Sequence, residues 1–186
     1  IKAYSIEKVV LSGDSLMAGY GLSNEHHLST VLQESLQLKG HNIEVINGSV
    51  SGSTSSAGLN RAEWTLSEPN IDLIVLSLGA NDMLRGIKPS ETKNNLEKII
   101  KIAQNKNIKV ILAGMIAPTS YGIKYKNNFD KIFPDLSKKY ELEFIPFLLK
   151  GVAMRAEFNL SDGMHPNKKG TIIISKTLEE IILKNL

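Results

Sequence analysis

The sequence predicts an α/β protein, with one parallel sheet of five strands inside a three-layer α/β/α sandwich. Short apolar segments alternate with segments of helical periodicity from one end of the chain to the other. The apolar segments are nearly continuous, as expected for strands that are covered on both faces. Because the chain contains no internal repeat, linker or low-complexity tract, we expect residues 1–186 to form a single domain.

Five segments are predicted to be strands. The strongest signal is in residues 71–78 (IDLIVLSL), where almost every residue is apolar. The other four segments are shorter but have the same character. They are residues 9–12, 43–46, 110–113 and 143–146.

Five further segments have the spacing of helices. Leucine and valine recur at helical spacing after His27, and Gly40 marks the end of that helix. Pro89 and Ser90 begin a helix, whereas Pro134 must lie at the start of its helix or kink it. The predicted helices are residues 27–39, 57–66, 89–105, 129–140 and 167–183, with loops at 47–56 and 115–125 and an irregular segment at 147–160.

Composition excludes several classes of protein. No apolar run approaches the roughly 20 residues that span a bilayer, so we expect no stable membrane insertion. The absence of cysteine excludes disulfides and thiolate metal sites. The net charge is +3, but the lysines are scattered without interleaved aromatic residues, which argues against nucleic acid as a partner. We expect a monomer or a small homo-oligomer.

Residues that carry chemistry follow the predicted strands. They are residues 13–16 (GDSL), 47–52 (NGSVSG), 79–82 (GAND) and, before the last helix, 162–167 (DGMHPN). In a parallel sheet these segments meet beyond the carboxyl ends of the strands, where ligands bind. They would bring together a serine hydroxyl, glycine N–H groups, an amide and an Asp/His pair, which are the parts of serine acyl transfer.

Each motif alone also has a structural interpretation. Gly, Asp and Ser all favour turns, Asn81 is compatible with an Asx turn, and Asp162 with a cap on the last helix. Asp14 is interpreted as a turn former that ties neighbouring loops rather than a second catalytic acid, since neighbouring residues on a turn point in different directions. The joint occurrence of the motifs at successive strand ends favours the catalytic interpretation.

Taken together, Gly13-Asp14-Ser15-Leu16, Gly52, Gly79-x-Asn81-Asp82 and Asp162-x-x-His165-Pro166 resemble the four blocks of the SGNH (GDSL) hydrolase superfamily. The likeness covers nearly the whole chain and is strongest to the bacterial thioesterase I/lysophospholipase L1/arylesterase group. It implies a flavodoxin-like fold. It also implies a serine esterase that hydrolyses small-molecule acyl esters or thioesters through an acyl-enzyme intermediate, without a cofactor.

The resemblance also implies a role for each matching residue. Ser15 would be the nucleophile, His165 the general base, and Asp162 the carboxylate that orients His165. The backbone N–H groups of Ser15 and Gly52 and the side-chain amide of Asn81 would form the oxyanion hole.

The loops after the third and fourth predicted strands are expected to bind the acyl group. Their apolar residues include Met83, Leu84, Ile116, Pro118 and Tyr121. The remaining histidines are His26, His27 and His41, and no pair of them has metal-ligand spacing backed by carboxylates. We therefore expect no metal site.

Two other functions remain open on the sequence alone. One is a carbohydrate O-acetylesterase, and the other is a non-catalytic flavodoxin-like module whose loop at residues 49–56 would cradle a flavin or a sugar phosphate. The chain begins with Ile1 rather than Met, so a processed N-terminus is expected. The resemblance favours a periplasmic or secreted protein, although a cytoplasmic one is also compatible with the sequence.

Overall fold

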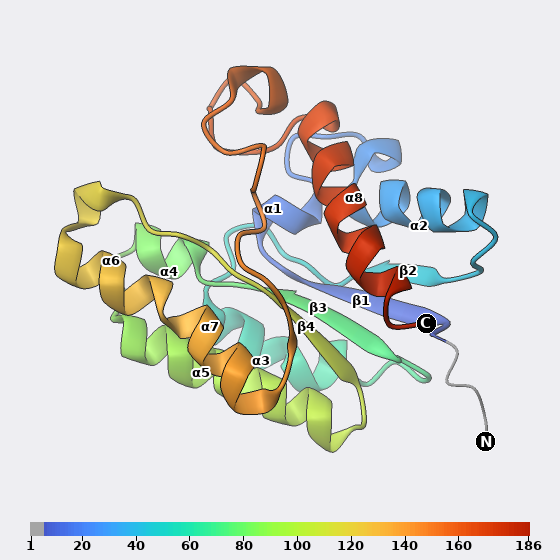
Figure 1. Cartoon of the computed structure of the whole chain (residues 1–186), viewed down its shortest axis with the longest axis horizontal. Coiled ribbons are helices and arrows are strands. Elements are labelled where there is room, and N and C mark those ends of the chain that lie inside the picture. The colour runs from blue at the N-terminus through green and yellow to red at the C-terminus, as the bar shows by residue number, and fades with distance from the viewer. Residues whose placement is uncertain (1–5) are drawn as a thin grey trace.

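The sheet of the computed structural model, which describes residues 6–186, contains five parallel strands in the order β2-β1-β3-β4-β5 (Figure 1). This confirms the predicted number and direction of the strands. The start of the chain, on which the expectation of a processed N-terminus rests, lies outside the described residues. The strands are β1 (Lys8–Gly13), β2 (Glu44–Asn47), β3 (Leu73–Ser77), β4 (Lys109–Ala113) and β5 (Glu143–Ile145).

The pairing register brings the carboxyl ends of β1 and β3 level with each other, and β2 ends two residues earlier. On β1, Leu11 pairs with Asn47 of β2, and Gly13 pairs with Ser77 of β3. The chain runs from β1 outward to β2 and then returns past β1 to β3, so the strand order reverses between β1 and β3. A crevice at such a reversal is where ligands bind in open α/β sheets.

Helices cover both faces of the sheet, as the three-layer prediction requires. Helices α2 (Leu28–Leu38) and α8 (Lys168–Leu183) cover one face, and α3 (Ser55–Thr65), α5 (Pro89–Asn105) and α7 (Ile132–Tyr140) cover the other (Figure 1). All five residues of β3 are buried between these layers. Within residues 6–186, none of the helices has the length and apolar character that crossing a membrane requires.

The segment after β4 differs from the sequence prediction. Residues 115–125 were expected to be a loop and 129–140 one helix, but the structure forms a 3-10 turn, η2 (Thr119–Tyr121), then α6 (Ile123–Asp130) and α7. The sequence of α6 is mostly polar, so its apolar periodicity is weak. Pro134 lies in the first turn of α7, where its missing N–H removes no helical hydrogen bond.

Four short elements carried no clear sequence signal. Helices α1 (Ser15–Ala18) and α4 (Ala80–Leu84) follow directly after β1 and β3, so each begins at the carboxyl edge of the sheet. The others are the 3-10 turns η1 (Asn24–His26) and η3 (Ala156–Phe158). One or two turns are too short to show a helical period.

Candidate active site

Ser15 is the first residue of α1, at the point where β1 ends. Asp14 caps this helix, because its Oδ1 accepts the Leu16 N–H at 3.0 Å. The turn also depends on Gly13, where a Cβ would come within 2.8 Å of the Ser77 carbonyl oxygen on β3. The local sequence therefore turns the chain sharply and leaves Ser15 at the carboxyl edge of the sheet.

His165 contacts both Ser15 and Asp162. Its Nε2 lies 2.9 Å from the Ser15 Oγ, and its Nδ1 lies 2.6 Å from the Asp162 Oδ2. With the ring proton on Nδ1, His165 donates to the carboxylate and leaves Nε2 free to accept the serine proton. Both distances are within the range for a nucleophile, its base and the group that orients the base. The structure thus brings together three residues that the sequence analysis had singled out.

Asp162 is held by the turn that it opens. Its Oδ1 accepts the backbone N–H groups of Met164 and His165, at 2.9 and 3.0 Å. These two backbone hydrogen bonds, followed by the one from the His165 ring, lower the pKa of Asp162 to about 2. The Leu160 N–H closes the turn by donating to the His165 carbonyl at 2.7 Å. At neutral pH the imidazole therefore faces a fully ionised carboxylate.

Asn167 ties this turn to α8. Its Oδ1 accepts the N–H groups of Lys169 and Gly170 and so caps the helix. Its Nδ2 donates to the carbonyls of Glu157 and Asn159, at 3.0 and 3.1 Å. The irregular segment before the turn and the helix after it are therefore joined through one side chain, two residues beyond His165.

The three predicted oxyanion donors lie on segments that contact one another. The Asn81 Nδ2 donates to the Ser53 carbonyl at 3.1 Å and lies 3.4 Å from the Asp14 Oδ2. Gly52 has a φ of +78°, a left-handed conformation that favours glycine, and its carbonyl accepts a hydrogen bond from Arg85 at 3.3 Å. These contacts draw the segments that carry Ser15, Gly52 and Asn81 together. The role of the three donors stays a prediction.

Asp14 directly precedes Ser15 in the sequence and is only 2% exposed. Burial raises the pKa of Asp14 to about 6, against the opposing effects of the Leu16 N–H, the charge of His165 and the Asn81 amide. The cap on α1 agrees with the interpretation of Asp14 as a turn former. Its contact with Asn81 joins the loop after β1 to the segment after β3, although no local spacing in the sequence identifies Asn81 as the partner.

Tyr20 also contacts His165, and the sequence gives no indication of this contact. Its ring centroid lies 4.3 Å from that of His165, and the two ring planes are inclined by 35°. Tyr20 follows Gly19, which ends α1 in a left-handed conformation. Its ring covers one side of the imidazole. No motif marks it, because the contact joins segments far apart in the sequence.

The residues predicted to bind the acyl group lie in different environments. Met83 is 7% exposed and belongs to the hydrophobic core. Leu84 and Ile116 are 51% and 44% exposed, and Pro118 is also at the surface. Tyr121 packs against Tyr125 with a centroid distance of 5.8 Å. Binding of the acyl group by these residues stays a prediction.

The structure also has a hollow away from the serine. It has a volume of about 880 Å³ and lies where β1 and β2 begin, and Lys8, His41 and Glu44 contribute to its lining. Neither Ser15 nor His165 lines it. The part of the chain that the structure describes contains no group of three or more His, Asp or Glu residues that could hold a metal ion.

Comparison with known proteins relates these features to a family. Residues 11–171 match the GDSL-like lipase/acylhydrolase family. An arylesterase of Vibrio mimicus is 34% identical over 180 residues, which cover 97% of this chain and 90% of that protein. Thioesterase 1/protease 1/lysophospholipase L1 of Escherichia coli K12 is 32% identical over 90% of this chain and 79% of its own length. The crystal structure of AlinE4, an SGNH-hydrolase family esterase, superposes with a TM-score of 0.81 at 36% identity, over 100% of this chain and 99% of that one.

Proposed function

Since this chain belongs to the GDSL-like lipase/acylhydrolase family, we propose that it hydrolyses acyl esters and thioesters through an acyl-enzyme intermediate on Ser15. The observation that carries the proposal is the chain of hydrogen bonds from Ser15 through His165 to Asp162. It supports the proposal because a hydroxyl, an imidazole and a carboxylate that are hydrogen-bonded in this order are the parts of a serine nucleophile, its base and the group that orients the base.

In the first half of the reaction, the Ser15 Oγ attacks the carbonyl carbon of the ester. Its proton passes to the His165 Nε2, 2.9 Å away. The carbonyl oxygen gains negative charge as the tetrahedral intermediate forms. The backbone N–H groups of Ser15 and Gly52 and the Asn81 amide would stabilise this charge by donating hydrogen bonds.

The intermediate then collapses, and His165 returns its proton to the leaving alcohol or thiol. Ser15 is left carrying the acyl group. A water molecule gives a proton to His165 and attacks the acyl carbon. As this second intermediate collapses, the bond from the acyl carbon to the Ser15 Oγ breaks and His165 returns the proton to that oxygen, which releases the acid and restores the serine. The ionised Asp162 stabilises the imidazolium in both halves, since its depressed pKa of about 2 keeps it charged throughout the neutral range.

The relatives indicate the substrate class. Their names include an arylesterase and a thioesterase/lysophospholipase, which supports activity on acyl esters and thioesters. Neither the carbohydrate O-acetylesterase nor the flavodoxin-like binding module is favoured by these relatives. Export to the periplasm or the medium and the oligomeric state stay predictions.

The test is hydrolysis of p-nitrophenyl esters from acetate to palmitate, together with acyl thioesters, by the wild type and Ser15→Ala. We expect the substitution to lower kcat by about 10⁴-fold to 10⁶-fold. Ser90→Ala, at an exposed serine of α5, is the matched control and should retain activity. A folded wild type that hydrolyses none of these substrates would contradict the proposed function. A Ser15→Ala enzyme with normal kcat would contradict the assigned nucleophile.

A further inference from the structure

Asp82 is a buried carboxylate that the proposed mechanism does not use. It has no exposed surface, and within residues 6–186 no lysine, arginine or histidine forms an ion pair with it. Burying a carboxylate without compensation is costly, so its hydrogen-bond donors must supply the compensation. The positions of those donors show which segments of the chain Asp82 connects.

Three hydrogen bonds converge on the Asp82 carboxylate. The Ser55 N–H donates to Oδ1 at 2.7 Å, and the Ser55 hydroxyl donates to Oδ2. The Thr92 hydroxyl also donates to Oδ2, at 2.8 Å. Ser55 is the first residue of α3, so the positive end of that helix also faces the carboxylate. Asp82 therefore joins three helices, because it lies on α4 and its partners lie on α3 and α5.

The two ends of this connection carry predicted oxyanion donors. Asp82 directly follows Asn81, and Ser55 lies three residues after Gly52. Two neighbouring contacts run between the same segments, from the Asn81 Nδ2 to the Ser53 carbonyl and from Arg85 to the Gly52 carbonyl. Two side chains of α4, Asn81 and Asp82, and that of Arg85 just after the helix thus fasten it to residues 52–55. The contact made by Asp82 is the buried one.

Helix α5 holds both partners of this contact in place. Thr92 anchors the carboxylate from one side, and the Asn95 Nδ2 donates to the Ser55 hydroxyl oxygen at 3.0 Å from the other. The Ser55 hydroxyl therefore donates to Asp82 and accepts from Asn95, and these two hydrogen bonds fix its orientation. Neither segment can shift without breaking a hydrogen bond in this buried network.

Capping of α3 alone does not account for Asp82. Thr54 already caps that helix, with its Oγ1 accepting the Ala57 N–H at 3.2 Å. The contact made by Asp82 is an addition to this cap, and it comes from a different strand end, 27 residues along the chain from Ser55.

We propose that Asp82 is a positioning residue that fixes the separation between the Gly52 N–H and the Asn81 amide. It would thereby set the width of the oxyanion hole without touching the substrate. The inference rests on the proposed hydrolase function. Its importance follows from the sensitivity of catalysis to geometry, since a displacement of about 1 Å can cost about 10²-fold in rate.

The test compares Asp82→Ala and Asp82→Asn with the wild type on p-nitrophenyl butyrate. We expect Asp82→Ala to lower kcat by about 10²-fold while KM changes by less than about threefold. Asp82→Asn keeps one acceptor oxygen for the Ser55 N–H, so its kcat should lie between those of Asp82→Ala and the wild type. The affinity for a trifluoromethyl ketone, whose adduct places an oxyanion in the hole, should fall in parallel with kcat/KM.

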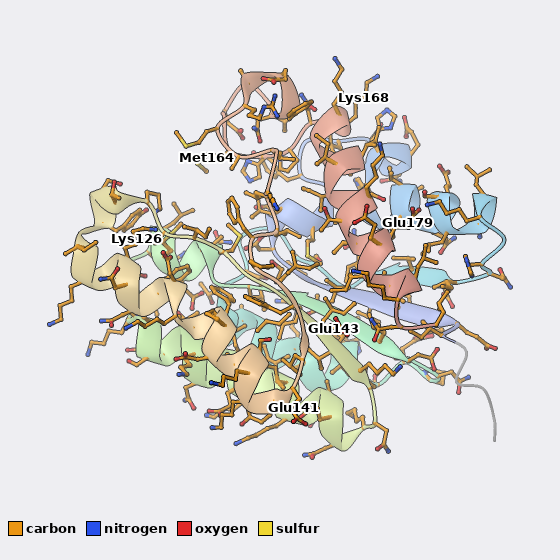
Figure 2. All side chains as sticks on the ribbon, in the orientation of Figure 1. Lys126, Glu141, Glu143, Met164, Lys168 and Glu179 are labelled. Atoms are coloured by element: carbon orange, nitrogen blue, oxygen red, sulfur yellow. The ribbon has the colours of Figure 1, made fainter. Side chains whose placement is uncertain are left out.

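The matched control is Glu179→Ala. Glu179 is also a buried carboxylate, 4% exposed, and it accepts hydrogen bonds from Ser35 and Lys39 between α2 and α8. Figure 2 shows it on α8, well along the helix from the loop that carries Met164. Its removal should lower Tm and leave kcat unchanged below Tm. If Asp82→Ala behaves in the same way, the proposal is overturned.

A double-mutant cycle with Asn81→Ala tests whether Asp82 acts through the oxyanion hole. If it does, the double variant should lose little more activity than Asn81→Ala alone, whereas fully additive losses would contradict the proposal. If Asp82→Ala does not fold, Asp82→Asn and Ser55→Ala decide the question, and a normal kcat in both would overturn the inference. An inactive wild type would instead contradict the proposed hydrolase function. Failure of that function can therefore be distinguished from failure of the role proposed for Asp82.

Discussion

Three carboxyl groups on the segments that form the candidate site, Asp162, Asp14 and Asp82, have different environments. Asp162 is partly exposed and accepts two backbone N–H groups, which lower its pKa to about 2. Asp14 is buried, and burial raises its pKa to about 6. Asp82 is buried too, but it accepts three hydrogen bonds from two residues. The three carboxyl groups therefore differ in burial and in hydrogen-bond donors, and these two factors set the different pKa values of Asp162 and Asp14.

Asn81→Ala tests the oxyanion hole at the level of one side chain. Loss of one such donor costs about 10²-fold to 10³-fold in kcat in a comparable hole, because the hydrogen bond strengthens only in the transition state. We therefore expect a fall of that size in kcat with little change in KM, measured by steady-state ester hydrolysis. Asn60→Ala, at an exposed asparagine of α3, should leave both constants unchanged. A rise in KM at constant kcat would argue that Asn81 binds the substrate rather than the oxyanion.

Asp14→Asn tests the effect of burial on stability. The folded-state pKa of about 6 lies above the usual value of 3.8, so between these pH values the folded protein holds a proton that the unfolded chain releases. The free energy of unfolding contributed by this group therefore falls as the pH rises from about 4 to about 6. Asp14→Asn keeps the acceptor for the Leu16 N–H and removes this loss. Urea denaturation should show a stabilised variant at pH 7.5 and a smaller difference at pH 4.5. An equal effect at both pH values would contradict the assigned pKa.

Among the helices and turns, Ser15 and Asn81 lie on the short helices α1 and α4, which directly follow β1 and β3, whereas His165 lies on a turn before the last helix, α8. The strands themselves were predictable, because strands covered on both faces read as apolar runs. Helices α1 and α4 were not, since four and five residues are too few to reveal a period. Helix α6 was missed because most of its residues are polar.

Asn167→Ala tests how α8 supports the turn that carries His165. The substitution removes the cap on α8 and the two donations to the preceding segment. We expect the free energy of unfolding to fall by about 1–2 kcal/mol and kcat to fall several-fold, measured by denaturation and ester hydrolysis. Asn167→Asp keeps the cap and loses only the donations, so it separates the two effects. An unchanged kcat in Asn167→Ala would show that the turn holds His165 without this support.

At the scale of the molecule, the parallel sheet brings distant segments to one edge. The convergence of residues 13–16, 52, 79–82 and 162–165 could be predicted from the order of strands and motifs, because parallel strands end on the same side. The contacts between Asn81 and Asp14 and between Asp82 and Ser55 could not. They join residues 67 and 27 positions apart, and sequence spacing carries no information about side-chain contacts at such separations.

Leu36→Ala tests whether the scaffold and the site are separable. Leu36 is fully buried on α2, and its carbonyl accepts the His41 N–H just before β2 begins, at the end of the sheet away from Ser15. A cavity there should lower the free energy of unfolding by about 2–5 kcal/mol. At temperatures well below Tm, kcat should be unchanged, as measured with p-nitrophenyl butyrate. A large loss of kcat in the folded variant would show that the packing of α2 reaches the site.

Covalent labelling tests whether Ser15 is the nucleophile of an acyl hydrolase. The wild type would be treated with a fluorophosphonate and the modified peptide identified by mass spectrometry, with ester hydrolysis followed in parallel. We expect a single adduct, on Ser15, that forms as activity disappears. We also expect the His165→Ala variant to be labelled much more slowly, because it lacks the base that would accept the serine proton. Two results would contradict the assignment of Ser15 as the nucleophile. One is inactivation that accompanies labelling of another residue, and the other is full activity after Ser15 has been labelled.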